Sequence, residues 1–148
     1  MDEDKVRDYA KDCTKIMPEA IQEEFVRMPA DLGFWNERCA DALRAHLLAK
    51  LAKDETHSRL YIHHRERMAA AGHKATETQV EAAIDTDPEM HEAQLRVVDT
   101  QVDYQRARGV VDAVSCKRDM LQSLGAHIRT EMEGDLVIRN RVAGANGR

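Results

Sequence analysis

The sequence has few aromatic residues and no long apolar run. Its 148 residues include two Phe, one Trp and three Tyr, although 43% of the chain is apolar. Apolar content carried mainly by small and aliphatic side chains suits thin seams between helices rather than one thick globular core. No stretch of about 18 uninterrupted apolar residues occurs, and the charged start MDEDKVRD is unlike a signal peptide. We therefore expect a cytoplasmic protein that does not enter the membrane.

Cysteine is also scarce. The chain has three cysteines, Cys13, Cys39 and Cys116, which are an odd number at wide spacing within helical patterns. Such cysteines are typical of reduced packing residues rather than of a disulfide framework or a metal site. The cysteine pattern indicates no redox chemistry.

Charge is segregated along the chain, although the net charge is only -5. Residues 76–104 contain eight acidic residues against Arg96 alone, a local net charge of -7, whereas residues 57–74 have a net charge of +3 and four histidines. A second, smaller basic stretch contains Arg139, Arg141 and Arg148. The acidic total argues mildly against a nucleic-acid partner, but the distribution leaves residues 57–74 as a candidate basic surface.

The three prolines predict where helices begin. Pro18 opens a short amphipathic helix that should bury Ile21, Phe25 and Met28. Pro29 should end this helix and start another of about 40 residues, which reaches a turn near Gly72.

Two further start signals follow this turn. Thr76 and Gln79 make a capping box for a short helix. Asp87-Pro88-Glu89 then begins a long helix that we expect to run to about Met132. Because no strand pattern competes, the sequence predicts an all-α fold, with a single helical domain over residues 1–134 and a flexible basic tail over residues 135–148.

The last long helix has two apolar rows. One keeps a heptad spacing, typical of a coiled-coil seam, through Met90, Ala93, Val97, Tyr104, Ala107, Val111, Val114, Leu121, Ile128 and Met132. The second row lies on another side of the helix and consists of Val102, Gly109, Ala113, Cys116, Met120 and Leu124.

One partner helix cannot cover two rows on different sides of a helix. We expect the first row to pack against the preceding long helix, through Leu32, Trp35, Cys39, Leu43, Leu47 and Leu51. The second row would then be the interface of a homo-oligomer. The alternative is a compact bundle in which the short helix with Phe25 covers the second row.

Three kinds of catalytic or metal site can be weighed. His57, His63, His64 and His73 lack a ligand pair at i, i+4 spacing and a nearby cysteine, so we expect no zinc. The acid pairs Glu19/Glu23 and Glu81/Asp85 resemble the spacing with which helical nucleotide pyrophosphatases hold magnesium, but charged helices produce this spacing by chance. Ser115-Cys116 has no base at helical spacing. We expect a non-enzymatic protein without a cofactor.

The basic segment is the stronger candidate for a binding site. Arg65 and Arg67 stand at the end of a long helix, where Tyr61 and His64 could stack on bases of a single strand. The alternative is that these cations only stabilise the carbonyl end of the helix. Repetition of a weak cationic site around an oligomer would favour binding.

The order of several short motifs resembles the UvsY-type recombination mediators of bacteriophages. The resemblance runs from about Phe25 to Gly134, through FVRMPADL, LYIHHRERMAAAG, DTDPEM, VDAV with Arg118, and the ending RTEMEG. The chain departs from the family pattern because it lacks paired tyrosines and dense lysines just before the glycine.

This resemblance implies a ring of helical hairpins, a hexamer to octamer with a heptamer favoured, in the host cell cytoplasm. It implies a protein that binds single-stranded DNA, helps displace the single-strand-binding protein and loads a RecA-like recombinase. The DNA contacts carried over by position are Arg65, Arg67 and Lys74, supported by Arg59 and His64. The alternative function is a helical phage assembly or scaffold protein that does not bind DNA.

Overall fold

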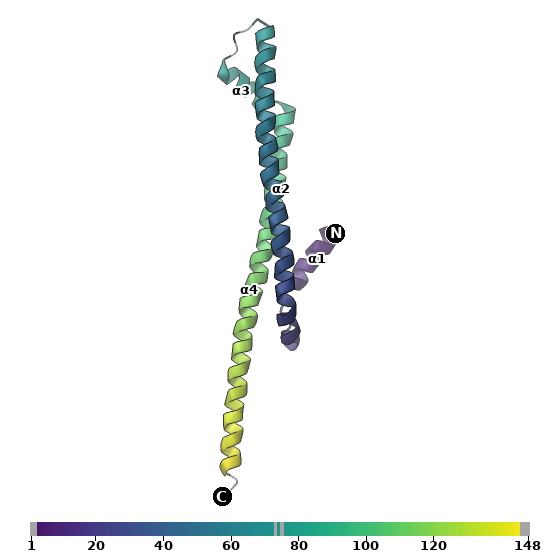
Figure 1. Cartoon of the computed structure of the whole chain (residues 1–148). Coiled ribbons are helices and arrows are strands. Elements are labelled where there is room, and N and C mark those ends of the chain that lie inside the picture. Colours follow the sequence, from purple (N-terminus) through teal and green to yellow (C-terminus); the bar gives the residue numbers. More distant parts are fainter. Residues whose placement is uncertain (1–2, 73, 75, 146–148) are drawn as a thin grey trace. The chain divides into compact units, whose positions relative to one another are not determined.

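The part of the chain that the structure describes is helical apart from short connections. The computed structural model describes residues 3–72, 74 and 76–145, and it contains no strand within them. The elements are α1 (Glu3–Thr14), a 3-10 turn (Pro18–Ala20), α2 (Ile21–Ala70), α3 (Glu77–Asp85) and α4 (Pro88–Ala145) (Figure 1). The predicted all-α class is confirmed.

The start signals of α3 and α4 act as predicted. The Gln79 side chain accepts a hydrogen bond from the Thr76 backbone N–H at 3.2 Å and completes the capping box. Asp87 Oδ1 accepts one from the Glu89 N–H at 2.9 Å, with Pro88 as the first residue of α4. The turn after α2 contains Gly72 at φ +75°, a conformation that residues with a Cβ rarely adopt.

Pro29 lies inside α2, so the predicted break at this proline is wrong. A proline inside a helix lacks the N–H that would bond the carbonyl four residues earlier, and its ring crowds that carbonyl. The neighbouring side chains Met28 and Asp31 are both buried. Packing on both sides of the proline therefore offsets its cost and keeps the helix continuous.

The predicted end of the last helix near Met132 is also wrong, because α4 continues to Ala145. The apolar seam that marked the helix fades at Met132, but the following residues contain no proline that would stop it. The segment predicted as a flexible tail is therefore helical as far as Ala145, and its residues 146–148 lie outside the described range.

The chain divides into two compact units, to which α2 and α4 each contribute. The first comprises residues 1–35 and 110–148, and the second comprises residues 36–109. The two units are defined by their internal contacts, which do not by themselves make them separate domains. The single domain over residues 1–134 therefore stays a prediction.

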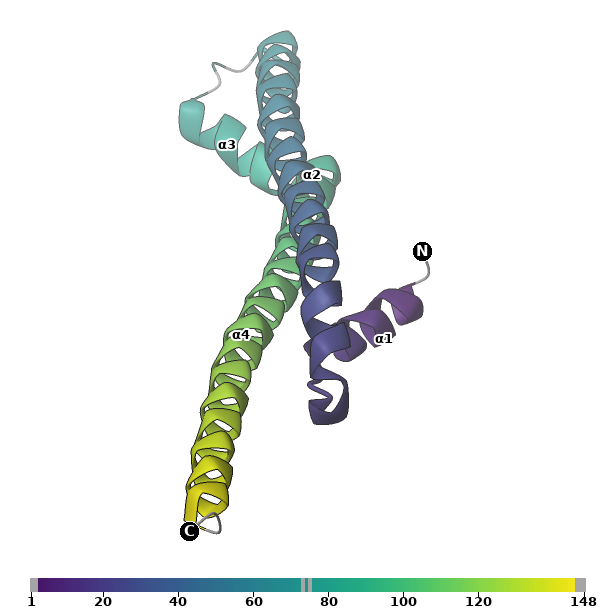
Figure 2. The same cartoon turned by 60° about the horizontal axis from the view of Figure 1, so that its bottom comes forward.

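Most of the few aromatic side chains lie in the first unit. Cys13, Met28, Trp35, Val114 and Leu121 form its buried core. Rings from α1 and α2 surround Trp35, which lies within 6.0 Å of the Tyr9 ring and 5.3 Å of the Phe34 ring, measured between centroids. Figure 2 shows α1 beside the first part of α2. The prediction that the cysteines are packing residues is confirmed for Cys13 but is wrong for Cys116, which is exposed.

Phe25 differs from the prediction for the short helix. Met28 is buried as expected, but Phe25 is 40% exposed and Glu24 is buried in its place. The Phe25 ring instead lies over Gly125, where an added Cβ would come within 3.3 Å of it. Gly125 thus leaves room for the ring on the surface of α4.

A small core in the second unit holds α3 on α2 and α4. Its buried residues are Leu60, Val80, Ile84 and Met90. Tyr61 and Met68 of α2 are partly buried against them. Figures 1 and 2 both place α3 beside the last turns of α2.

The first apolar row of α4 is buried or half-buried from Met90 to Ile128, as predicted, whereas Met132 at its end is 63% exposed. The predicted counterpart on α2 is partly wrong, because Leu43, Leu47 and Leu51 are 37%, 55% and 56% exposed. The covered row of α2 beyond Trp35 is instead a set of mostly small or polar side chains, namely Cys39, Ala42, His46, Ala49, Lys53, Thr56 and Leu60.

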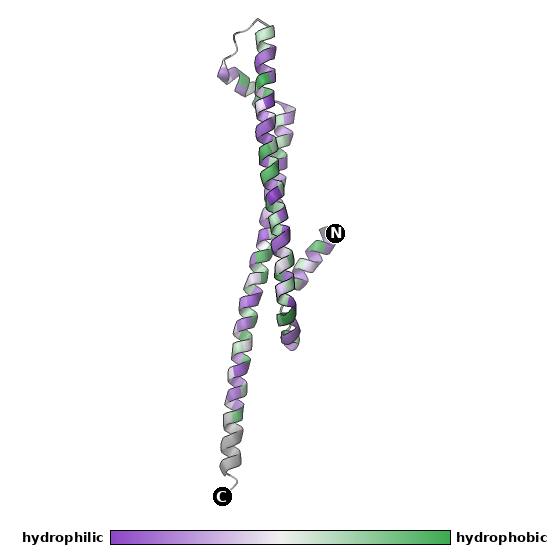
Figure 3. Ribbon diagram, viewed as in Figure 1, coloured by the Kyte–Doolittle hydropathy of each residue, from purple (hydrophilic) through white to green (hydrophobic). Residues whose placement is uncertain are grey.

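Helix geometry explains this correction. The covered residues alternate spacings of four and three, which keeps them on one side of a helix. The leucines are spaced by four throughout, and each step rotates them about 40° further from that side. In Figure 3, apolar and polar residues alternate along α2 and α4. No described helix has an apolar window long enough to cross a membrane.

Candidate nucleic-acid interface

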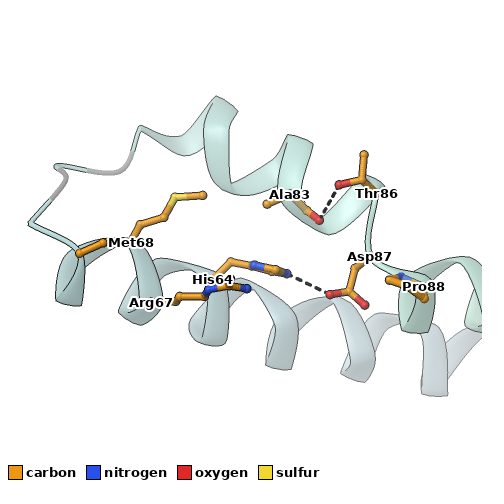
Figure 4. A pocket seen from close by; sticks show the side chains of 8 residues that line it. His64, Arg67, Met68, Ala83, Thr86, Asp87 and Pro88 are labelled. Atoms are coloured by element: carbon orange, nitrogen blue, oxygen red, sulfur yellow. Dashed lines mark hydrogen bonds and ion pairs between the residues drawn. The ribbon is translucent and has the colours of Figure 1, made fainter.

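The last turns of α2, the end of α3 and the start of α4 enclose an open groove of about 380 Å³ (Figure 4). His64 and Met68 point from α2 toward Asp87 and Ala83 across it. The remaining lining residues are Arg67, Ala71, Thr86 and Pro88. Of the predicted DNA contacts, only His64 and Arg67 line this groove.

Arg59 is held by an ion pair within the second unit. Its Nη1 donates to Glu89 Oε2 at 3.1 Å, and its Nη2 contacts the other carboxylate oxygen. This two-pronged contact lowers the pKa of Glu89 and raises the pKa of Arg59. A DNA phosphate at Arg59 would therefore compete with Glu89.

His64 is similarly engaged. Its Nε2 lies 3.1 Å from Asp87 Oδ2, and the two side chains are 12% and 19% exposed. The Glu89 N–H, followed by His64, lowers the pKa of Asp87. His64 and the partly buried Tyr61 thus contribute to the packing of this unit, which leaves less of each ring for stacking on a base.

Arg65, Arg67 and Lys74 are exposed, and none of them forms an ion pair with another described residue in the structure. A separation of two residues along a helix corresponds to a rotation of roughly 200°, so the side chains of Arg65 and Arg67 point to different sides of α2. Arg67 faces the groove and Arg65 does not. The predicted contacts therefore do not form one continuous patch on this helix.

A third pair joins the basic and acidic segments. His57 Nε2 lies 3.1 Å from Glu81 Oε2, between α2 and α3. The sequence pointed to His57 and Glu81 separately, as a metal-ligand candidate and as part of an acid pair. Together with Arg59–Glu89 and His64–Asp87, this contact shows that the acidic segment meets the basic segment within one chain. The opposite local charges of residues 57–74 and 76–104 could have suggested this pairing.

Of the histidines weighed for zinc, His57 and His64 have separate carboxylate partners, and His73 lies outside the described residues. The rings of His63 and His64 are 5.5 Å apart between centroids and inclined by 71°. Within the residues that the structure describes, no three His, Cys, Asp or Glu side chains are placed to share a metal ion.

The second apolar row of α4 lies largely on the surface. Val102 is 41% and Met120 is 55% exposed, and Gly109, Ala113 and Cys116 are also exposed. Leu124 is half-buried, next to the Gly125 that Phe25 covers. Because the first five residues of this row are exposed, the alternative of a short helix that covers them is wrong.

Comparison with known proteins identifies no relative: no family model, no curated protein and no solved structure matches this chain.

Proposed function

We propose that this protein is a non-enzymatic recombination mediator that binds single-stranded DNA. In this role it helps displace the single-strand-binding protein and loads a RecA-like recombinase during phage recombination and repair. The supporting observation is that Arg65 and Arg67 remain exposed at the end of α2, whereas Arg59, His57 and His64 nearby have carboxylate partners. Cations without a carboxylate partner can neutralise phosphates without first breaking an internal ion pair.

The proposed assembly is a ring of antiparallel hairpins formed by α2 and α4. Contacts in the second unit are consistent with this hairpin, since His46 lies 3.4 Å from Thr100, whereas Arg59, later in α2, meets Glu89 at the start of α4. Repetition around the ring would place several weak cationic sites along one strand. Multivalency would then raise the affinity well above that of a single site.

Fluorescence anisotropy with a labelled single strand tests the DNA contacts. We expect salt-sensitive binding that the double change Arg65→Ala/Arg67→Ala weakens by at least about tenfold, because two phosphate contacts are lost in every subunit. A matched control is Arg44→Ala/Arg108→Ala, which removes two exposed arginines outside the basic segment. Equal weakening by both double changes would contradict the assigned site.

The second candidate is a helical assembly or scaffold protein that does not bind DNA. The exposed Leu43, Leu47 and Leu51 favour it, because apolar side chains on the surface of a helix can associate with another protein surface without binding DNA. Sedimentation with and without single-stranded DNA separates the two functions. A scaffold would form the same particle in both conditions at moderate salt, whereas a mediator would sediment with the DNA.

A further inference from the structure

The groove at the end of α2 has partly apolar walls contributed by three helices and the turn after α2. Met68 and Ala71 come from α2 and the turn after it, Ala83 comes from α3, and Pro88 comes from α4. Its volume of about 380 Å³ lies at the small end of the range typical of small-molecule sites, roughly 300–1,000 Å³. The groove is therefore large enough for one ring system.

The polar atoms that line the groove mostly have partners already. The Thr86 hydroxyl donates to the carbonyl oxygens of Ala82 and Ala83, both at 3.1 Å. Asp87 contacts the His64 ring and the Glu89 N–H. An occupant therefore meets apolar side chains beside the paired His64 and Asp87, and the charged group at its edge that has no carboxylate partner in the described structure is Arg67.

This combination is complementary to a nucleotide. A base has a flat apolar face that can pack on apolar side chains such as Met68 and Pro88, and its phosphate carries the negative charge that Arg67 would meet. We propose that each groove holds one base of the bound single strand, with a phosphate next to that base on Arg67. This inference rests on the proposed function and adds to it, because phosphate contacts alone do not require bases.

Arg65 has a different part in this arrangement. It leaves α2 on another side from Arg67 and does not line the groove. The Arg65 side chain would therefore contact only the phosphates of the bound strand. The two arginines are therefore separable by experiment. Arg67→Gln weakens a strand with bases more than an abasic strand, because only a base in the groove holds its neighbouring phosphate at Arg67, whereas Arg65→Gln weakens both strands equally.

The test compares a labelled oligothymidine with an abasic strand of the same length and phosphate number. For the full chain we expect the oligothymidine to bind roughly tenfold more tightly at moderate salt. Ala71→Leu fills the groove and should reduce this preference to about twofold. Ala69→Leu is the matched control, because Ala69 is also exposed but does not line the groove, and it should keep the tenfold preference.

The outcomes distinguish this inference from the proposed function. Equal binding of both strands by the unchanged protein would overturn the base site and leave the DNA-binding function intact. Equal effects of Ala71→Leu and Ala69→Leu on the preference would also overturn it. Failure to bind either strand at low salt would overturn both proposals. Circular dichroism of both variants checks that their helical content is unchanged.

Discussion

Lys117 of α4 forms an ion pair with Glu24 of α2 inside the first unit, where their side chains are 3% and 6% exposed. Both groups lose most of their hydration, so the pair is stable only because each charge has its partner. Neither residue belongs to the apolar pattern of its helix. It fixes which turn of α2 lies against which turn of α4 in this unit.

The buried pair predicts unequal effects of single and double changes. Lys117→Met leaves the Glu24 carboxylate buried without a partner and should lower the free energy of unfolding by about 3–5 kcal/mol. Glu24→Met/Lys117→Met removes both charges and should restore most of this loss. Urea unfolding followed by circular dichroism measures both values. A double variant as unstable as the single one would contradict the assignment.

Tyr9 predicts a change of stability at alkaline pH. Its hydroxyl donates to Asp31 Oδ1 at 2.8 Å, and this bond to a buried carboxylate, together with desolvation, raises the pKa of Tyr9 from 10.0 to about 12. The unfolded chain therefore loses this proton at lower pH than the folded protein. The stabilisation is complete below pH 10 and declines as the pH rises toward 12.

Absorbance at 295 nm should show one tyrosine that titrates near pH 12. Tyr9→Phe should abolish this late step, whereas Tyr104→Phe is the control and should leave it unchanged. Loss of the late step in Tyr104→Phe would show that Tyr104, and not Tyr9, has the raised pKa.

Asp87 predicts a second pH dependence, with the opposite sign. Its pKa lies below the ordinary value of 3.8, chiefly because of the Glu89 N–H, and Arg59 likewise lowers the pKa of Glu89 from 4.5. A carboxyl with a depressed pKa stabilises the fold above its ordinary value, and this contribution is lost as the pH falls through the folded value.

Asp87→Asn tests this dependence, since asparagine can still cap α4 but carries no charge. We expect its melting temperature to lie below that of the unchanged protein at pH 7 and to approach it at pH 3. Asp85→Asn changes an exposed acid of α3 and serves as the control. A difference that is the same at both pH values would show that the charge of Asp87 does not matter.

Local signals made much of this fold predictable. Gly72, the Thr76 capping box and Asp87-Pro88 act within a few residues, so the ends of α2 and α3 and the start of α4 could be placed from the sequence. The continuation of α2 through Pro29 could not be predicted, because a helix tolerates an internal proline only where packing offsets its cost, here around the buried Met28 and Asp31. Local propensity is a weak guide where tertiary contacts decide.

The side of α2 that packs inward was less predictable. Assigning the large apolar residues to the interior selected Leu43, Leu47 and Leu51, yet Ala42, His46 and Ala49 are the covered residues. In the candidate site, Arg65, Arg67 and Lys74 could be read as exposed cations. The internal partners of Arg59 and His64 could not be found from either segment alone, because each pair joins residues more than twenty positions apart.

The exposed second row of α4 gives the last prediction. If Val102, Gly109, Ala113, Cys116 and Met120 meet a second copy of the chain, Met120→Glu places a charge in an apolar interface and should reduce the particle to smaller species. Met120 is 55% exposed in the single chain, so the change should leave its helices intact. Met132→Glu is the matched control, because Met132 is 63% exposed and lies outside this row.

Sedimentation velocity measures the particle size. An unchanged size in Met120→Glu, with dissociation in Leu47→Glu/Leu51→Glu, would move the interface to the leucines of α2.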